Sequence, residues 1–160
     1  DGKTIIKFNP NDTQHINHMN AIFSVSNIDE YDLFVKIDDD DIYKKNYIQN
    51  IINIFELNDV DVVSSKVNVQ LNGEIVRRVN QSNLGGNPDG CDFYMPPTFA
   101  FNRKALDLIS IINENYGFED NMWRDTWCQN ECKLLEVDNT SEYIWHIHGK
   151  NISTSDFLIS

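Results

Sequence analysis

Four consecutive carboxylates, Asp38–Asp41, directly follow an apolar stretch at residues 31–37, YDLFVKI. Adjacent carboxylates repel one another unless a cation neutralises them, so packing alone does not explain the run. On a turn, alternate residues point the same way, and we therefore expect Asp38 and Asp40 to face one ion together. Oxygen ligands of this kind suit Mg²⁺ or Mn²⁺, with a phosphate completing the shell. The alternative is a solvated acidic loop that merely ends a strand, and the position after a buried stretch favours the metal site.

An acidic pair, Glu119 and Asp120, lies in the stretch YGFEDNMW, where we expect a helix to begin. Such a pair is often only a favourable charge near the positive end of a helix dipole. An aspartate in this position can also take a proton from an attacking hydroxyl group, provided that it lies within hydrogen-bonding distance. The pair alone does not decide between these interpretations.

Two histidines, His146 and His148, flank one residue in the β-prone stretch YIWHIHGKN. On a strand both side chains point to one side, where they can hold a metal; the alternative is a packed histidine beside Trp145. Two other histidines, His15 and His18, fall on the first expected helix. No acidic cluster is close to them in sequence, so we interpret both as surface or core residues.

The elements that must position these groups alternate between strands and helices. Short β-prone stretches predict strands at residues 3–8, 31–37, 60–65, 99–101, 133–137 and 143–147. Apolar spacing predicts one helix capped by Asn11 or Asp12 that carries Ile16, Met19, Ile22 and Phe23, and further helices at 47–55, 103–113 and 119–130. Asn72-Gly73 predicts a hairpin turn, and residues 82–97, rich in Gly, Pro and Asn, predict a loop.

This order of elements is typical of an α/β fold with a mostly parallel sheet flanked by helices. In such sheets, ligands bind beyond the carboxyl ends of the strands. The run Asp38–Asp41 falls at that place.

The composition fits a single globular domain and excludes one class of partner. The chain has 160 residues and a net charge of −12, from 13 basic and 25 acidic side chains. A nucleic-acid partner would need a basic surface that replaces phosphate counterions, so we expect none. No stretch approaches the roughly 20 apolar residues that span a bilayer, and no signal peptide is visible. We therefore expect a cytoplasmic protein, with the inner face of the membrane as an alternative place of action.

The three cysteines, Cys91, Cys128 and Cys132, are an odd number. With no secretory signal, this count favours reduced thiols. Cys128 and Cys132 are four residues apart and would share a helix face. That spacing suits a metal only weakly, and we prefer a plain half-buried pair.

The three acidic and histidine motifs, in this order, resemble those of the inverting glycosyltransferases with the GT-A fold, a family 2-like group. The matching residues are Asp38, Asp40 and Asp41 for the D-x-D motif and the Asp that commonly follows it, Glu119 and Asp120 for the E-D motif, and His148, Gly149, Asn151 and Ser153 for the motif near the end. The resemblance covers residues 3–155. In that family, two more strand–helix units precede the region where residues 3–8 begin, and they form much of the nucleotide-base pocket. We therefore expect residues 1–160 to be one partial GT-A-like catalytic domain without its N-terminal strands.

The resemblance implies a metal-dependent enzyme that moves a sugar from a nucleotide-diphosphate donor to a hydroxyl group, on a saccharide or another acceptor, with inversion. Asp40 and Asp38 would bind Mn²⁺ or Mg²⁺, with His148 as a further ligand. Asp38 and Asp39 would contact the nucleotide sugar. The metal would neutralise the charge that builds on the departing diphosphate.

The acceptor side of the reaction is assigned by the same resemblance. Asp120 would deprotonate the acceptor hydroxyl group, and Glu119 would orient the helix start or the acceptor. The loop 82–97 would close over both substrates and exclude water. Trp123 and Trp127 would either stack on an acceptor sugar or anchor their helix in the core.

Three other functions fit parts of the sequence. A phosphatase with an aspartyl nucleophile also places Asp after a buried strand, but its D-x-D-x-[TV] pattern is not met, and Tyr43 lies in that region. A hydrolase built on His146 and His148 generally needs more ligands after the pair than the remaining residues supply. A non-catalytic nucleotide-sugar or metal-binding relative of the same fold is the main alternative to the transferase.

Overall fold

A computed structural model of the chain describes residues 9–71, 73–79, 99–112, 119–139 and 141–147. The strand predicted at 3–8, the loop predicted at 82–97, and the ligand candidate His148 lie outside these residues. Within them, the predicted α/β class is confirmed by four α-helices and two mixed β-sheets.

The first sheet, sheet A, contains four short strands. In spatial order they are β1 (Leu33–Val35), β6 (Phe99–Asn102), β3 (Val62–Ser65) and β7 (Leu134–Val137). β6 is antiparallel to both β1 and β3, and β3 is parallel to β7. It follows that β1, β3 and β7 all run in one direction, and their carboxyl ends lie at one edge of sheet A.

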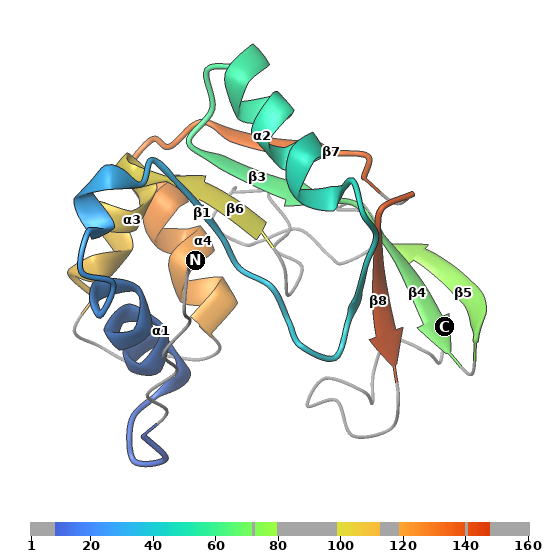
Figure 1. Cartoon of the computed structure of the whole chain (residues 1–160), viewed down its shortest axis with the longest axis horizontal. Coiled ribbons are helices and arrows are strands. Elements are labelled where there is room, and N and C mark those ends of the chain that lie inside the picture. Colours follow the sequence, from blue (N-terminus) through green and yellow to red (C-terminus); the bar gives the residue numbers. More distant parts are fainter. Residues whose placement is uncertain (1–8, 72, 80–98, 113–118, 140, 148–160) are drawn as a thin grey trace.

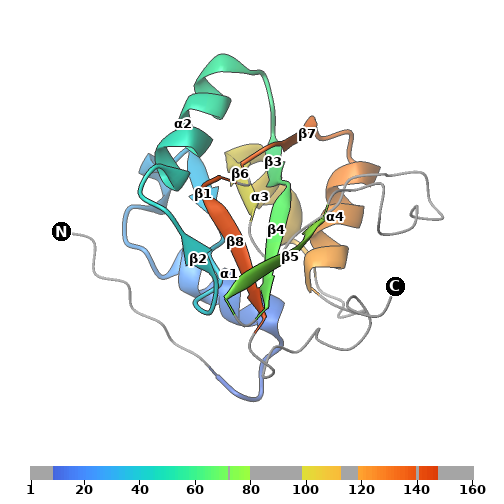
Figure 2. The same cartoon turned by 90° about the vertical axis from the view of Figure 1, so that its right-hand side faces the viewer.

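The second sheet, sheet B, has the order β2 (Ile42–Tyr43), β8 (Tyr143–Ile147), β4 (Val67–Leu71) and β5 (Glu74–Val79). Only Lys66 separates β3 from β4, so the chain passes almost directly from sheet A to sheet B (Figure 2). β4 and β5 form the predicted hairpin. Gly73 in its turn has φ +88°, a conformation that glycine adopts without the steric cost of a side chain.

The prediction of a mostly parallel sheet is wrong for the described strands. Only the β3–β7 and β4–β8 pairs are parallel there, and the other pairs are antiparallel. The alternation of strands and helices along a sequence does not specify which strands become neighbours. In this fold, β6 lies between β1 and β3 and runs antiparallel to both, so these two parallel strands are not paired with each other.

The helices cover both faces of sheet A. They are α1 (Gln14–Phe23), α2 (Tyr47–Leu57), α3 (Arg103–Ser110) and α4 (Glu119–Gln129), with a short 3₁₀ turn at Ile28–Glu30. α1, α3 and α4 lie together on one side, and their buried residues pack with Val62, Phe99 and Phe101 (Figure 1). On the other face, α2 packs against Val63 and Ala100. Strand residues alternate between the two helical layers, as the pleat of a strand requires.

The first helix differs from its prediction in detail. Its N-cap is Thr13, whose hydroxyl group accepts from the Ile16 N–H, rather than Asn11 or Asp12. Its buried residues are His15, Asn17 and Met19, whereas Ile16 and Phe23 are exposed. His15 accepts from the distant Trp123, and Asn17 bonds to the nearby Asn9, so polar contacts that apolar spacing does not show help to set the buried face.

The core on the α4 side is aromatic. Trp123 and Trp127 pack edge-on against Phe99, each with ring centroids 5.5 Å apart. Both indoles are almost completely buried, with relative exposures of 1% and 0%. Their N–H groups donate to His15 Nδ1 and to the Ala105 carbonyl oxygen. They therefore anchor α4 in the core, and neither ring is available to stack on a sugar.

The cysteines differ from their prediction. Cys128 is disulfide-bonded, and Cys132 is a free, half-buried thiol. The expectation of reduced thiols is thus wrong for Cys128, and a sulfur in a disulfide does not serve as a thiolate metal ligand.

None of the helices in the described part of the chain is both long and apolar enough to cross a membrane.

Candidate metal and catalytic site

Three of the four consecutive aspartates converge. Asp38, Asp40 and Asp41 each offer a carboxylate oxygen, and these oxygens all lie within 4.8 Å of one another. Oxygens at such separations can share one divalent cation as ligands. The structure therefore brings together the predicted pair Asp38 and Asp40. It adds Asp41 and leaves Asp39 exposed and outside the cluster.

The acidic turn is formed where the two sheets meet. After β1 ends, the Lys36 N–H still donates to the Phe99 carbonyl oxygen of β6 at 2.8 Å. The chain then turns, and the Asp38 N–H donates to the Tyr43 hydroxyl oxygen at 3.0 Å. Tyr43 belongs to β2, which pairs with β8 in sheet B. The turn is thus held between a strand end of sheet A and an edge strand of sheet B.

Asp41 is held by two hydrogen bonds from β8. The Tyr143 hydroxyl group donates to its Oδ2 at 2.8 Å, and the His146 backbone N–H donates to its Oδ1 at 2.9 Å. The pKa of Asp41 is nevertheless raised to about 6, mainly because of burial, with the charges of Asp38 and Asp40 adding to the rise and the two hydrogen bonds opposing it.

Asp38 shows the same balance. Burial raises its pKa, Lys36 opposes this, and the charges of Asp40 and Asp39 add to it. The ionised cluster is therefore short of positive charge. A divalent cation would supply that charge, and the all-oxygen ligand set matches Mg²⁺ or Mn²⁺. The residues present fit the predicted metal.

The histidine motif has a described contact with the acidic turn. His146 contacts Asp41 through its backbone N–H. That bond places β8 beside the acidic turn. His148 lies just beyond β8 and outside the described residues, so its role as a ligand stays a prediction.

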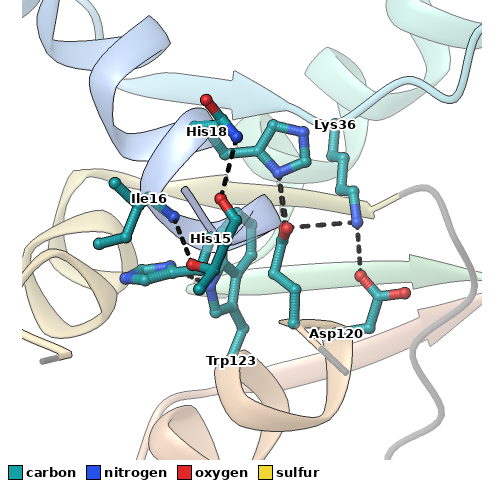
Figure 3. Close-up of polar contacts among 9 residues, drawn as sticks. His15, Ile16, His18, Lys36, Asp120 and Trp123 are labelled. Atoms are coloured by element: carbon teal, nitrogen blue, oxygen red, sulfur yellow. Dashed lines mark hydrogen bonds and ion pairs between the residues drawn. The ribbon is translucent and has the colours of Figure 1, made fainter. Parts of the chain in front are cut away.

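The acidic pair at the start of α4 is bound to a lysine from the end of β1 (Figure 3). Lys36 Nζ lies 2.5 Å from Asp120 Oδ1 and 3.4 Å from Glu119 Oε1. The Glu119 carboxylate is buried and also accepts from His18 Nδ1 of α1, at 2.7 and 2.8 Å to its two oxygens. Four charged or titratable groups from α1, β1 and α4 thus form one network.

Burial and neighbouring charges tune Asp120. Burial raises its pKa, the Lys36 ammonium group opposes this, and the charges of Glu119 and Asp38 raise it again. Burial alone would lower the pKa of Lys36, but Asp120 and Glu119 outweigh it and the net direction is upward. Lys36 and Asp120 each therefore favour the charged form of the other. Asp38 acts on both partners, which places the network beside the acidic turn.

Sequence reasoning missed two members of this site, Lys36 and His18. Lys36 carried a signal, since it is the one cation in the apolar stretch 31–37 and a buried charge needs a partner. His18 carried none, because its partner Glu119 is 101 residues away in sequence.

Comparisons of the chain with protein-family models, with curated proteins and with solved structures gave no match.

Proposed function

We propose that this chain is the catalytic part of a divalent-metal-dependent glycosyltransferase, which moves a sugar from a nucleotide-diphosphate donor to a hydroxyl acceptor with inversion. The observation that carries the proposal is the convergence of Asp38, Asp40 and Asp41 at the carboxyl end of β1, with Asp120 held nearby by Lys36. A metal-binding turn and a carboxylate that can accept a proton are the two groups that this reaction requires.

The acidic turn serves the donor. A divalent cation held there by Asp38, Asp40 and Asp41 would supply positive charge for the diphosphate leaving group. The hydrogen bonds from Tyr143 and His146 fix Asp41 before the donor arrives. Such preorganised ligands do not have to rearrange during the reaction.

Asp120 serves the acceptor. Its carboxylate takes the proton of the acceptor hydroxyl group as the hydroxyl oxygen forms a bond to the anomeric carbon. The bond from that carbon to the diphosphate oxygen breaks, and the nucleoside diphosphate leaves from the opposite face. Because burial raises the pKa of Asp120, its ionised form is a stronger base than an exposed aspartate.

A second function is favoured by one observation. Asp120 is already engaged by Lys36 at 2.5 Å, as it would be in a protein that binds metal and nucleotide sugar without transfer. Turnover separates the two functions.

The test is release of nucleoside diphosphate from a panel of UDP- and GDP-sugars, with Mn²⁺ or with EDTA. We expect release only with metal. Asp120→Asn should lower kcat by about 10²–10⁴-fold with metal and donor binding retained, because the amide cannot accept the proton. Asp29→Asn, at an almost fully exposed carboxylate, is the matched control and should be unchanged. Full activity of Asp120→Asn would exclude this base, and metal-dependent binding without turnover would establish the second function.

A further inference from the structure

Lys36 is a nearly buried cation that leaves β1 and reaches the first turn of α4. Its side chain is only 10% exposed, and it directly follows the apolar residues Leu33–Val35 of β1. A buried charge is costly unless it is paired. Here it is paired with both acidic residues at the start of α4.

The position of the Lys36 ammonium group is fixed by the core. Its backbone N–H bonds to Phe99, and its Nζ lies 5.3 Å from the centre of the Phe99 ring and 5.7 Å from that of Trp123. Both rings are buried and offer their electrons to a cation. The ammonium group therefore has little freedom to move, and its position sets where the two carboxylates lie.

Glu119 completes the arrangement from α1. His18 Nδ1 contacts both of its oxygens, and this holds Glu119 beside Lys36. Asp120 uses Oδ1 for the lysine, and among the described residues its Oδ2 has no hydrogen-bond partner. One oxygen is thus held while the other is available to a proton donor.

We propose that Lys36 is a positioning residue for the transfer: it clamps Asp120 through one carboxylate oxygen, at a fixed place beside the acidic turn two residues further along the chain. This role rests on the proposed function. It also explains why an engaged Asp120 need not be an inactive one, since the clamp leaves the second oxygen for the acceptor.

The first experiment measures the steady-state kinetics of Lys36→Met and Lys36→Arg with Mn²⁺ and a UDP- or GDP-sugar that the wild type uses. Lys36→Met keeps the apolar stem and removes the clamp, so kcat should fall about 100-fold, as misplacement of a reacting group does, with the donor KM unchanged. Lys36→Arg keeps the charge but shifts the carboxylate, and its loss should be about tenfold. If Lys36→Met does not fold, the kcat of Lys36→Arg decides the outcome. Wild-type kcat in a folded variant would overturn the proposal.

The second experiment needs no turnover. Melting temperatures are compared for Lys36→Met, Asp120→Asn and the double variant, with Lys36→Arg in place of the methionine variant if that does not fold. Residues in contact have non-additive effects, and we expect a departure from additivity of at least about 4 °C. Lys104→Met is the control. It breaks an equally direct ion pair, to Asp61 at 2.7 Å, at the opposite edge of sheet A. It should combine additively with Asp120→Asn and leave kcat unchanged.

The two experiments separate the clamp from the proposed function. Additive melting temperatures in an active enzyme would overturn the clamp and leave the transferase standing. Non-additive temperatures, in a wild type that releases no nucleoside diphosphate from any donor, would overturn the transferase and reduce the clamp to a structural ion pair.

Discussion

The four neighbouring aspartates are chemically identical, and the fold makes them different. Asp41 is half-buried and accepts hydrogen bonds from two groups of β8, whereas Asp39 faces solvent. The position of Asp41 beside two other carboxylates is electrostatically unfavourable, and a bound cation would relieve that repulsion. At the scale of the residue, Asp41 is therefore the most informative position in the acidic turn.

Asp41→Asn should have opposite effects on metal binding and on metal-free stability. The amide keeps the size of the side chain and removes one charge from a crowded cluster. We expect Mn²⁺ affinity, measured by calorimetry, to fall at least about tenfold. The melting temperature in EDTA at pH 7.5 should rise, because a destabilised buried charge is gone. Unchanged Mn²⁺ affinity would remove Asp41 from the ligand set, and Asp29→Asn controls for the loss of one negative charge.

The pH dependence of metal-free stability follows from the same carboxyl group. Its pKa is about 6 in the folded protein and near the ordinary value of 3.8 in the unfolded chain. The folded state therefore holds this proton more tightly, and the contribution of Asp41 to stability is lost as pH rises from about 4 through 6. Melting temperatures in EDTA from pH 4 to 8 should show that loss as a difference between wild type and Asp41→Asn. Parallel curves would contradict the raised pKa.

At the scale of the element, the positions of single helices and turns were more predictable than the pairing of the strands. Helix α2, helix α4 and the hairpin at Gly73 lie where apolar spacing and turn chemistry predicted them, because these signals are local. The direction of the sheet was not predictable, since it depends on β6 entering between two strands far from it in sequence. The site divides in the same way. The acidic turn was found from adjacent residues, whereas the Lys36 and His18 contacts join segments 84 and 101 residues apart.

Asp61 lies at the opposite end of the strands of sheet A from the acidic turn, directly before β3. Its carboxylate accepts from Lys104 Nζ at 2.7 Å, from the Lys133 N–H at 2.9 Å and from the Asn102 side chain at 2.9 Å, so it ties together the starts of α3, β3 and β7. Burial raises the pKa of Asp61, but these three donors outweigh it and the net direction is downward. Asp61→Ala should lower the free energy of unfolding by about 1–3 kcal/mol at pH 7, measured in urea.

The sign of the pH effect is opposite to that of Asp41. Because the folded pKa of Asp61 is depressed, its stabilisation is present above the unfolded pKa near 3.8 and is lost as pH falls below it. The wild type and the alanine variant should therefore approach one another in stability in acid. Mn²⁺ affinity should not change, and a loss of metal binding in Asp61→Ala would mean that the two edges of the sheet are not independent.

At the scale of the whole molecule, the acidic turn is a connection between two sheets. It leaves β1 of sheet A, enters β2 of sheet B, and is bonded to β8 through Asp41. Lys66, between β3 and β4, is another short connection between the two sheets. A ligand that binds all three carboxylates therefore binds where the two sheets are connected. Its stabilising effect should extend to strands of both sheets.

Mn²⁺ should for this reason stabilise the entire folded unit. A ligand present at 100 times its dissociation constant, and bound only by the folded state, contributes about 2.7 kcal/mol. For a chain of this size that corresponds to a rise of roughly 5–11 °C in melting temperature. Amide hydrogen exchange gives the spatial information: protection should increase in β1, β2 and β8, and much less in α3, whose Lys104 is bonded to Asp61 at the opposite end of sheet A. Asp40→Asn should abolish both effects and Asp29→Asn neither. A rise in melting temperature that persists in Asp40→Asn, or protection that is not centred on β2 and β8, would place the cation elsewhere and remove the basis for assigning the donor diphosphate to the acidic turn.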